Sequence, residues 1–391
     1  MPCYNVVTLL PFLLSRVTAM HLGALTQWQT LLAIEVEAAL HLTWDRQGVL
    51  ATPLNDVWRS AMLGWFPGHM NKAQRQIQQA LPKIDVVVEV LDARLPYSSA
   101  NPMLAQLTRH KPVLKLLSRA DLADPIATQQ WCDYFNAQPN MRALAITTTN
   151  ARELKPIAKL CRELAGHIRA DRDVRVMVMG IPNVGKSTLI NGLAGRKLAK
   201  VGNEPAVTKR QQIIKLENGI SLTDTPGVLW PKIEDQASAY RLAASGAIRD
   251  TALDYPDVAK VTVAELARRY PDALKARYKL TELPIFDMGK AVKQEAEQPE
   301  IEVDDNGLSY IDLLARTGFD GDALLDTIAR KRGGLKAGGI VDIHRGAEVL
   351  LHELRQGVLG RITLELPQDI PQDEPARPDT LPETDDNDSD S

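Results

Sequence analysis

The chain has 391 residues, of which 45% are hydrophobic and 24% charged, a composition typical of a soluble globular protein with two or three domains. Its formal net charge of −3 comes from the end of the chain, where nine acidic residues and one basic residue lie between Asp369 and Ser391. Its three cysteines follow no paired spacing and no apolar run reaches the length of a membrane helix, which excludes a disulfide-rich secreted protein and a membrane-spanning one.

Residues 1–61 are apolar and irregular, with one predicted helix around Leu31–Leu42. The apolar run Val6–Leu14 is short, is followed closely by Arg16 and has no basic segment before it, which argues against a secretory signal. Two interpretations stay open for this segment: a genuine N-terminal extension, or a start codon assigned too early, with Met62 as the true start.

Short apolar runs alternate with helical stretches from Ile84 onwards, and these runs are Ile84–Leu91, Pro112–Leu117, Arg142–Ile146 and Val174–Met179. Two further runs, Gln211–Leu216 and Ile220–Thr223, flank Asn218-Gly219, which is a two-residue hairpin signal. Parallel strands with crossover helices and one antiparallel hairpin predict a three-layer α/β domain over residues 62–251.

Helical spacing of apolar residues replaces the strands after residue 251, at Val263–Tyr270, Asp272–Tyr278, Tyr310–Arg316, Asp322–Lys331 and Asp342–Arg355. We therefore expect a small all-α domain at residues 252–366, interrupted by a charged stretch at Lys290–Asn306. The tail, residues 367–391, is rich in proline and acidic residues and is expected to be disordered.

A phosphate-binding loop is predicted at Gly180–Ser187, where GIPNVGKS matches the P-loop pattern directly after a strand and before a helix. Its glycines let backbone amides point inward, and the helix N-terminus adds positive potential. We expect Lys186 to reach the terminal phosphates and Ser187 to ligate Mg²⁺. The predicted nucleotide contacts in this segment are Asn183, Val184, Gly185, Lys186, Ser187 and Thr188.

The tetrapeptide Asp224-Thr225-Pro226-Gly227 ends the second strand of the predicted hairpin. An aspartate at this place holds Mg²⁺ through water, and the amide of Gly227 can sense a γ-phosphate. Alone, such a tetrapeptide is more often a turn. With the P-loop upstream and Thr208 between the two motifs, it indicates a magnesium site formed by Ser187, Thr208 and Asp224.

A base-reading element is predicted at Ser118-Arg119-Ala120-Asp121, where GTPases usually have Asn-Lys-x-Asp after a strand. Asp121 can accept hydrogen bonds from guanine, and Arg119 can lie over the base. Because Ser118 is too short to replace an asparagine amide, we expect guanine selectivity with weakened affinity. The tetrapeptide alone also fits a surface loop or a helix N-cap. Thr147 and Thr148, after the next strand, complete the predicted contacts.

The motifs run in an unusual order, because the base-reading element precedes the P-loop, whereas ordinary small GTPases have it last. With this order, residues 62–366 resemble the ribosome biogenesis GTPase A family of circularly permuted GTPases. The matching motifs are Trp65–Met70 (WFPGHM), Asp92–Pro96 (DARLP), Asn101-Pro102, the P-loop, Asp224–Gly227, Trp230-Pro231 and Lys331–Gly333 (KRG). The family has WFPGHM at its N-terminus, which favours Met62 as the start, and has Asn-Lys in place of Ser118-Arg119.

Val228 follows Gly227 where many GTPases have a water-positioning glutamine, and valine cannot orient a water molecule. The resemblance implies His69 as the substitute catalytic residue, although packing of His69 against Trp65 and Phe66 is an equal alternative. In similar GTPases an asparagine at the place of Asn183 helps to hold a potassium ion that supplies the charge of an arginine finger. An ordinary loop asparagine is the alternative.

Basic residues cluster in the helical domain beside glycines, at Arg330, Lys331, Arg332 and Lys336. Such a cluster is by default a solvated helix face. Cations beside exposed backbone also suit RNA phosphates, and Lys72 and Arg75 add to the basic residues. The resemblance favours ribosomal RNA as the partner, and hence a helical domain that binds RNA or the ribosome.

The resemblance implies a GTPase, slow alone and stimulated by potassium and the ribosomal subunit, that docks on a late large-subunit precursor and is released on hydrolysis. It implies GTP as substrate, Mg²⁺ and K⁺ as cofactors, and a monomer off the ribosome in a bacterial-type cytoplasm, with an organelle left open. Two alternatives stay open: a GTP-binding module with negligible turnover, and a metabolic P-loop enzyme, for which the sequence offers no second catalytic constellation.

Overall fold

The computed structural model describes residues 67–195, 212–216, 219–230, 233, 235–248, 254–287 and 310–370. These residues all belong to one unit of the chain, residues 62–391. The predicted helix at Leu31–Leu42, the predicted magnesium ligand Thr208, the charged stretch Lys290–Asn306 and the tail beyond residue 370 lie outside them. None of the helices in the described part of the chain is long and apolar enough to span a membrane.

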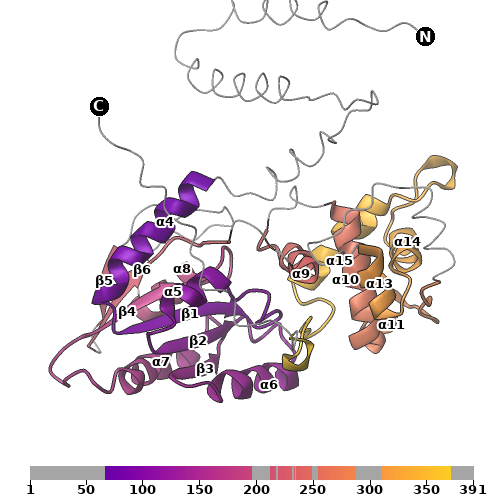
Figure 1. The fold of residues 1–391 in the computed structure, drawn as a ribbon. Coiled ribbons are helices and arrows are strands. Elements are labelled where there is room, and N and C mark those ends of the chain that lie inside the picture. The colour runs from indigo at the N-terminus through magenta and orange to yellow at the C-terminus, as the bar shows by residue number, and fades with distance from the viewer. Residues whose placement is uncertain are drawn as a thin grey trace, which may run out of the picture. The chain divides into compact units, whose positions relative to one another are not determined.

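A six-stranded sheet forms the centre of the N-terminal part of the described chain (Figure 1). Its strands are β1 (Val86–Asp92), β2 (Val113–Ser118), β3 (Met141–Ala145), β4 (Val174–Met179), β5 (Gln212–Leu216) and β6 (Ile220–Asp224). They lie in the order β3-β2-β1-β4-β6-β5, and every pair is parallel except β5 with β6. All six predicted strands are therefore present, including the antiparallel hairpin.

The helices of this part are α4 (Pro67–Ala80), α5 (Pro102–Thr108), α6 (Pro125–Asn136), α7 (Ala151–Leu164) and α8 (Lys186–Ala194), with a short 3₁₀ turn η2 (Leu81–Lys83). Helices α5 and α6 each begin with a helix-starting pattern. Their N-cap residues, Asn101 and Asp124, accept hydrogen bonds from free amides of the first turn, and a proline follows each N-cap.

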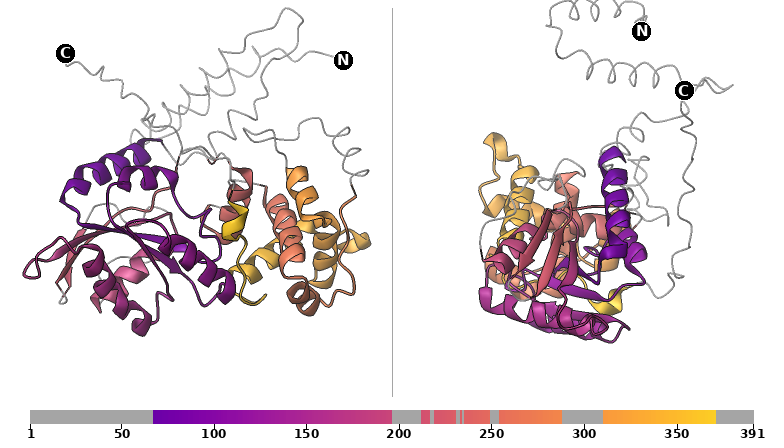
Figure 2. Two further views of the ribbon diagram at one scale, coloured as in Figure 1. Left: turned by 60° about the horizontal axis from the view of Figure 1, so that its bottom comes forward. Right: turned by 90° about the vertical axis from the view of Figure 1, so that its left-hand side faces the viewer.

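Successive residues of β1 face opposite sides of the sheet. Val86, Val88 and Val90 pack in one cluster with residues of α7 and α8, whereas Val87 packs with α4 and α5 and Leu91 with α6. The sheet is thus covered on both faces, which gives the predicted three layers (Figure 2).

A second group of helices follows the sheet: α9 (Gln236–Ser245), α10 (Tyr255–Arg269), α11 (Pro271–Tyr278), α13 (Tyr310–Thr317), α14 (Gly321–Lys331) and α15 (Ile343–Arg355), with 3₁₀ turns η3 (Ala337–Gly339) and η4 (Pro367–Asp369). Helix α10 begins eight residues before the predicted helix, at the cap Asp254, and α9 was not predicted. Helix α9 contributes to both cores, since Leu242 packs with the sheet and Ala243 with α10 and α15. The turn η4 lies within the predicted tail.

The segment Arg361–Leu366, named here the C-terminal strap, contacts both parts of the described chain. Its Ile362 and Leu364 side chains are buried in the helical core. Its backbone meanwhile bonds to the α/β part, with the Ile362 amide donating to the Leu122 carbonyl at 2.9 Å and the Leu364 amide to the Arg94 carbonyl at 2.7 Å. The strap therefore joins the helical core to the loops at the ends of β1 and β2.

A buried ion pair crosses the sheet between β1 and β2, where Lys115 Nζ lies 2.5 Å from Glu89 Oε2. Removing one charge leaves the other buried without a partner, whereas replacing both residues with apolar side chains leaves no buried charge. We expect Glu89→Gln to lower the free energy of unfolding by about 3–5 kcal/mol, and the pair Glu89→Leu with Lys115→Met to cost less than that single change. Denaturant unfolding measures both, and a cost below about 1 kcal/mol for Glu89→Gln contradicts the prediction.

Candidate nucleotide-binding site

The three predicted motifs meet at one edge of the sheet, where β2, β4 and β6 end. Asp92 opposes Ser118 in the pairing of β1 with β2, and Val178 opposes Asp224 in the pairing of β4 with β6. Ligands of open α/β sheets bind at the carboxyl ends of the strands. The base-reading element, the P-loop and Asp224 therefore lie at a common edge, although they are far apart in the sequence.

The P-loop turns tightly over β1. Gly180 has φ of 149°, and a Cβ on it would lie only 2.4 Å from the carbonyl oxygen of Val90, so only glycine fits. Lys186, which begins α8, is buried and donates to the Ile181 carbonyl at 2.6 Å. Burial lowers the pKa of Lys186 to about 8, and the nearby carboxylate of Asp224 opposes this shift. The loop thus holds a poorly solvated ammonium group, which an anionic phosphate would stabilise in its charged form.

Gly227 lies against the P-loop. A Cβ at this residue would come within 2.9 Å of Lys186 Nζ and 3.1 Å of Pro182. The preceding turn is fixed by Thr225, whose hydroxyl donates to the Val178 carbonyl at 2.8 Å. The amide of Gly227 is therefore close to the group that is expected to bind the terminal phosphates.

The start of α8 and the end of β6 carry oxygen donors that fit a magnesium ion. Ser187 offers a hydroxyl in the first turn of α8, and Asp224 offers a buried carboxylate on the neighbouring strand. Both are the hard oxygen donors that Mg²⁺ prefers. Magnesium bound by Ser187 and Asp224 would neutralise charge on the phosphates.

The base-reading element is fixed to the P-loop by two of its side chains. Ser118 is fully buried, and its hydroxyl lies 2.8 Å from the Leu91 carbonyl and 2.7 Å from the Val184 carbonyl, which share its one proton. Arg119 Nη2 donates to the Asn183 carbonyl at 2.5 Å. Ser118 therefore reaches the P-loop backbone in spite of its length. Stacking of Arg119 on a base, and the effect of Ser118-Arg119 on guanine affinity, stay predictions.

A buried network at the end of β1 supports Arg119 and was not predicted. Asp92 accepts hydrogen bonds from Arg94 Nε at 2.9 Å and Nη2 at 2.7 Å, and from Arg119 Nη1 at 3.2 Å. Burial alone would raise the pKa of Asp92, but Arg94 and Arg119 lower it to about 2. The carboxylate therefore stays ionised. The sequence held one signal for this network: the acidic Asp92 and the basic Arg94 lie two residues apart at the end of a buried apolar run.

A cleft of about 640 Å³ opens beside the base-reading element, a size that suits a small-molecule ligand. Five of its lining residues are predicted nucleotide contacts: Arg119, Asp121, Thr147, Thr148 and Asn183. Others were not predicted, namely Leu122, Thr149, Ser245–Ile248 after α9, and Arg355 and Gln356 at the end of α15. The segments after α9 and at the end of α15 lie outside every motif, so no local pattern could have identified them.

Two of the residues considered for hydrolysis, Asn183 and Val228, lie at this edge of the sheet, where the Val228 amide donates to the Gly180 carbonyl at 3.3 Å. Asn183 has φ of 60° and donates its side-chain amide to the Gly246 carbonyl at 3.0 Å, leaving its Oδ1 as the atom that a potassium ion would need. Val228 is buried, and its carbonyl accepts from Asn101 at 2.8 Å. His69 lies in the first turn of α4, and its side chain is outside the described residues. The potassium and catalytic roles stay predictions.

The predicted RNA-binding cations of the helical domain each have a partner within the protein: Arg330 with Asp326, Lys331 with the Lys279 carbonyl, Arg332 with the Arg277 carbonyl, and Lys336 with Asp342. Arg330, Lys331 and Lys336 are nevertheless exposed. Arg75 is exposed on α4, and the side chain of Lys72 lies outside the described residues. RNA binding by these residues stays a prediction.

The sheet, the P-loop at its carboxyl edge and the base-reading element that precedes it in sequence define a P-loop GTP-binding protein of circularly permuted motif order. Residues 175–275 match a family model described as 50S ribosome-binding GTPase. Ribosome biogenesis GTPase A of Priestia megaterium is 41% identical over 317 residues, which are 79% of this chain and 98% of that protein. The chain belongs to the ribosome biogenesis GTPase A family.

Two further relatives are similar over most of their length. Ribosome biogenesis GTPase A of Bacillus cereus is 41% identical over 318 residues, which are 79% of this chain and 95% of that protein. The crystal structure of GNP-bound YlqF from T. maritima covers 76% of this chain and 100% of its own, with 27% identity and a TM-score of 0.46.

The lowered pKa of Asp92 predicts an acid-sensitive contribution to stability. Because its pKa in the folded state lies below that of an unfolded aspartate, this contribution is complete above the unfolded value and disappears as the pH falls through about 2. We expect Asp92→Asn to lower the free energy of unfolding by at least about 2 kcal/mol at pH 7, and the difference from wild type to shrink below pH 5.

Urea unfolding at several pH values measures this difference. Asp171→Asn is the matched control, because Asp171 pairs with Arg169 on the surface and should have no measurable effect. A cost for Asp92→Asn that does not change with pH would show that its charge is not the source of the stability.

Exchange of Asp121 tests the assignment of the base site. A carboxylate accepts from the N1–H and amine of guanine, whereas an amide can instead donate to the second carbonyl of xanthine. We expect Asp121→Asn to weaken GDP binding by about 100-fold and to strengthen XDP binding. Fluorescence competition titrations measure both, with Asp133→Asn on the exposed face of α6 as the control. Unchanged preference for GDP would rule out Asp121 as the base reader.

Proposed function

We propose that this chain is a GTPase that binds a late precursor of the large ribosomal subunit through ribosomal RNA, promotes its maturation and is released on GTP hydrolysis. The observation that carries the proposal is the meeting of Lys186, Asp224 and Asp121 at one edge of the sheet. Relatives that share about four-fifths of the chain are named for ribosome biogenesis. The protein acts in a bacterial-type cytoplasm and is a monomer off the ribosome.

The residues of the proposed site divide the work of this reaction among them. Lys186 binds the terminal phosphates, Ser187 and Asp224 hold Mg²⁺ together with Thr208, and Gly227 donates its amide to the γ-phosphate. Asp121 reads the guanine edge while Arg119 covers the base, with Thr147 and Thr148 beside it. The Asn183 side chain holds K⁺, whose charge stabilises the transition state as an arginine finger does in other GTPases.

His69 orients the attacking water in this proposal. His69 lies in the first turn of helix α4. Further along this helix, Ile77 packs in one apolar cluster with Met179 and Val228. Met179 directly precedes the P-loop, and Val228 directly follows Gly227, so α4 covers the face of the sheet beneath the phosphate site. A residue in the first turn of this helix is a reasonable replacement for the missing glutamine.

The exposed cations of the helical domain, Arg330, Lys331 and Lys336, contact ribosomal RNA, together with Arg332. Salt bridges such as that of Lys336 with Asp342 are weak on the surface, so a phosphate can replace the carboxylate at small cost. Lys72 and Arg75 on α4 add contacts next to the catalytic turn. Binding of RNA there would bring the ribosome close to His69.

A GTP-binding module with negligible turnover is the second candidate. The observation in its favour is Val228, which is buried among apolar residues and presents no group that could orient water. In that case the nucleotide only sets the conformation of a protein that binds RNA or ribosomes.

Hydrolysis assays distinguish the GTPase from the binding module. GTP turnover is measured with and without purified large ribosomal subunits, in potassium or in sodium. The proposed GTPase function predicts turnover that requires potassium and rises at least about tenfold with subunits. It also predicts that His69→Ala loses this turnover while GTP binding persists. His167→Ala, an exposed histidine after α7, is the control and should behave as wild type. GTP binding without stimulated turnover under any of these conditions would favour the binding module.

A further inference from the structure

We infer that Arg361, in the C-terminal strap, is a positioning residue for guanine recognition: it holds the loop that carries Asp121 in the conformation that reads the base. This inference rests on the proposed guanine site. Arg361 Nε donates to the Ala123 carbonyl at 2.8 Å, and its Nη2 donates to the Ala120 carbonyl at 2.8 Å. One side chain of the C-terminal strap thus binds the loop on both sides of Asp121.

The geometry of these two bonds fixes the shape of the loop. A guanidinium group is planar, and its donors stand in a rigid fork. Bonding to Ala120 and Ala123 at the same time sets the distance between their carbonyls and hence the path of the two residues between them. The Ile362 amide also donates to the Leu122 carbonyl at 2.9 Å. Three of the four carbonyls from Ala120 to Ala123 are therefore bound by the strap.

The loop needs this support because part of its own conformation is unfavourable. Arg119 has φ of 57°, in the left-handed region, which costs roughly 1 kcal/mol or more for a residue with a side chain. Within the α/β part, the backbone after Arg119 is held by a bond from the Ala120 amide to the Ile146 carbonyl at 3.2 Å and by a bond from the Leu122 amide to the Arg119 carbonyl at 2.9 Å. The strap adds bonds on the other side of the same backbone.

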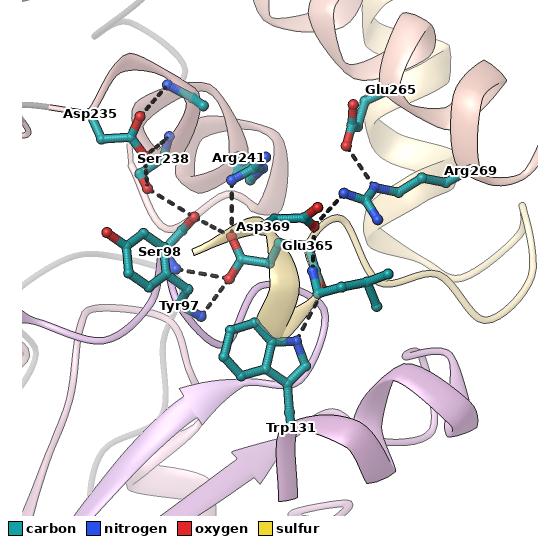
Figure 3. Close-up of polar contacts among 12 residues, drawn as sticks. Tyr97, Ser98, Trp131, Asp235, Ser238, Arg241, Glu265, Arg269, Glu365 and Asp369 are labelled. Carbon is teal, nitrogen blue, oxygen red and sulfur yellow. Dashed lines mark hydrogen bonds and ion pairs between the residues drawn. The ribbon is translucent and has the colours of Figure 1, made fainter. Parts of the chain in front are cut away.

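The strap is itself firmly held, so Arg361 acts from a fixed position. Glu365 is buried and accepts from the amides of Tyr97 and Ser98 at 2.5 and 2.9 Å, and from Arg241 at 3.3 Å (Figure 3). The Trp131 indole donates to the Glu365 carbonyl at 3.0 Å (Figure 3). These bonds lie at the far end of the strap from Arg361, and together with the buried Ile362 and Leu364 they prevent the strap from following the loop.

Because both donors of Arg361 end on the base-reading loop, its loss should affect base discrimination more than phosphate binding. Inosine nucleotides offer a direct measure, since they lack the exocyclic amine of guanine and so form one bond fewer with Asp121. A well-positioned carboxylate separates GDP from IDP strongly. A loop that has lost its support separates them less.

Calorimetric titration of the full chain with GDP and IDP tests the inference in Arg361→Ala and Arg361→Lys. We expect Arg361→Ala to weaken GDP binding about tenfold and IDP binding less, so that the preference for GDP falls about threefold or more. Arg361→Lys places a single ammonium group that can reach one of the two carbonyls, and it should lie between alanine and wild type. Arg345→Ala is the control, since Arg345 is an exposed cation on α15 paired with Glu348. The titrations of Arg345→Ala should match wild type. The melting temperatures of the Arg361 variants should stay within a few degrees of wild type, because Arg361 is exposed and only its two loop bonds are lost.

An equal loss of affinity for GDP and IDP in Arg361→Ala, or no loss, would overturn the inference. Asp121→Asn, titrated in the same way, separates this failure from failure of the guanine site. If Asp121→Asn leaves the ratio of GDP to IDP affinity unchanged, the guanine site itself is wrong. If Asp121→Asn changes the ratio and Arg361→Ala does not, only the role of Arg361 is wrong.

Discussion

The parallel pairing of β1 with both β2 and β4 is the constraint on which the nucleotide site depends. It places Ser118, at the end of β2, and Gly180, just after β4, on the two sides of the same strand. Gly180 approaches the Val90 carbonyl so closely that no side chain fits between them. Because these contacts join strands and not neighbours in the chain, the order of the motifs does not affect them. The permuted chain therefore brings the predicted base-reading element, the P-loop and the proposed magnesium ligands Ser187 and Asp224 to one edge.

Hydrogen bonds at this edge connect the base and phosphate regions. Ser118 reaches the Val184 carbonyl and Arg119 the Asn183 carbonyl, so both residues that replace the usual Asn-Lys pair bind the P-loop backbone. The direction of Arg119 is set in turn by the ionised carboxylate of Asp92. A change in Arg119 or Asp92 is therefore transmitted to the P-loop backbone as well as to the predicted base-reading element.

Local signals in the sequence were sufficient for the strands, the P-loop and the capped helices, because each depends on residues a few positions apart. The network around Asp92 was not predictable in this way, since its partner Arg119 lies 27 residues away. The contacts of the strap were even less predictable, because Ser98 and Glu365 are separated by 267 residues and no spacing pattern relates them. Helix α9 was missed for a different reason: its QASAYRLAAS sequence has few large apolar side chains, and only its cap, Asp235, marks its start.

One segment belongs to the helical core and to the support of the base-reading loop. Ile362 buries its side chain among the helices while its amide binds the Leu122 carbonyl, so displacement of the helices would move the loop. Linkage makes such coupling reciprocal: a partner that shifts the strap changes guanine affinity by the same factor by which guanine changes affinity for the partner. In the proposed function the γ-phosphate is sensed separately, at Gly227. The helical domain would then respond to an occupied base site, and the loop after β6 would respond to the number of phosphates. The empty, GDP-bound and GTP-bound forms of the protein would therefore differ in affinity for the ribosome.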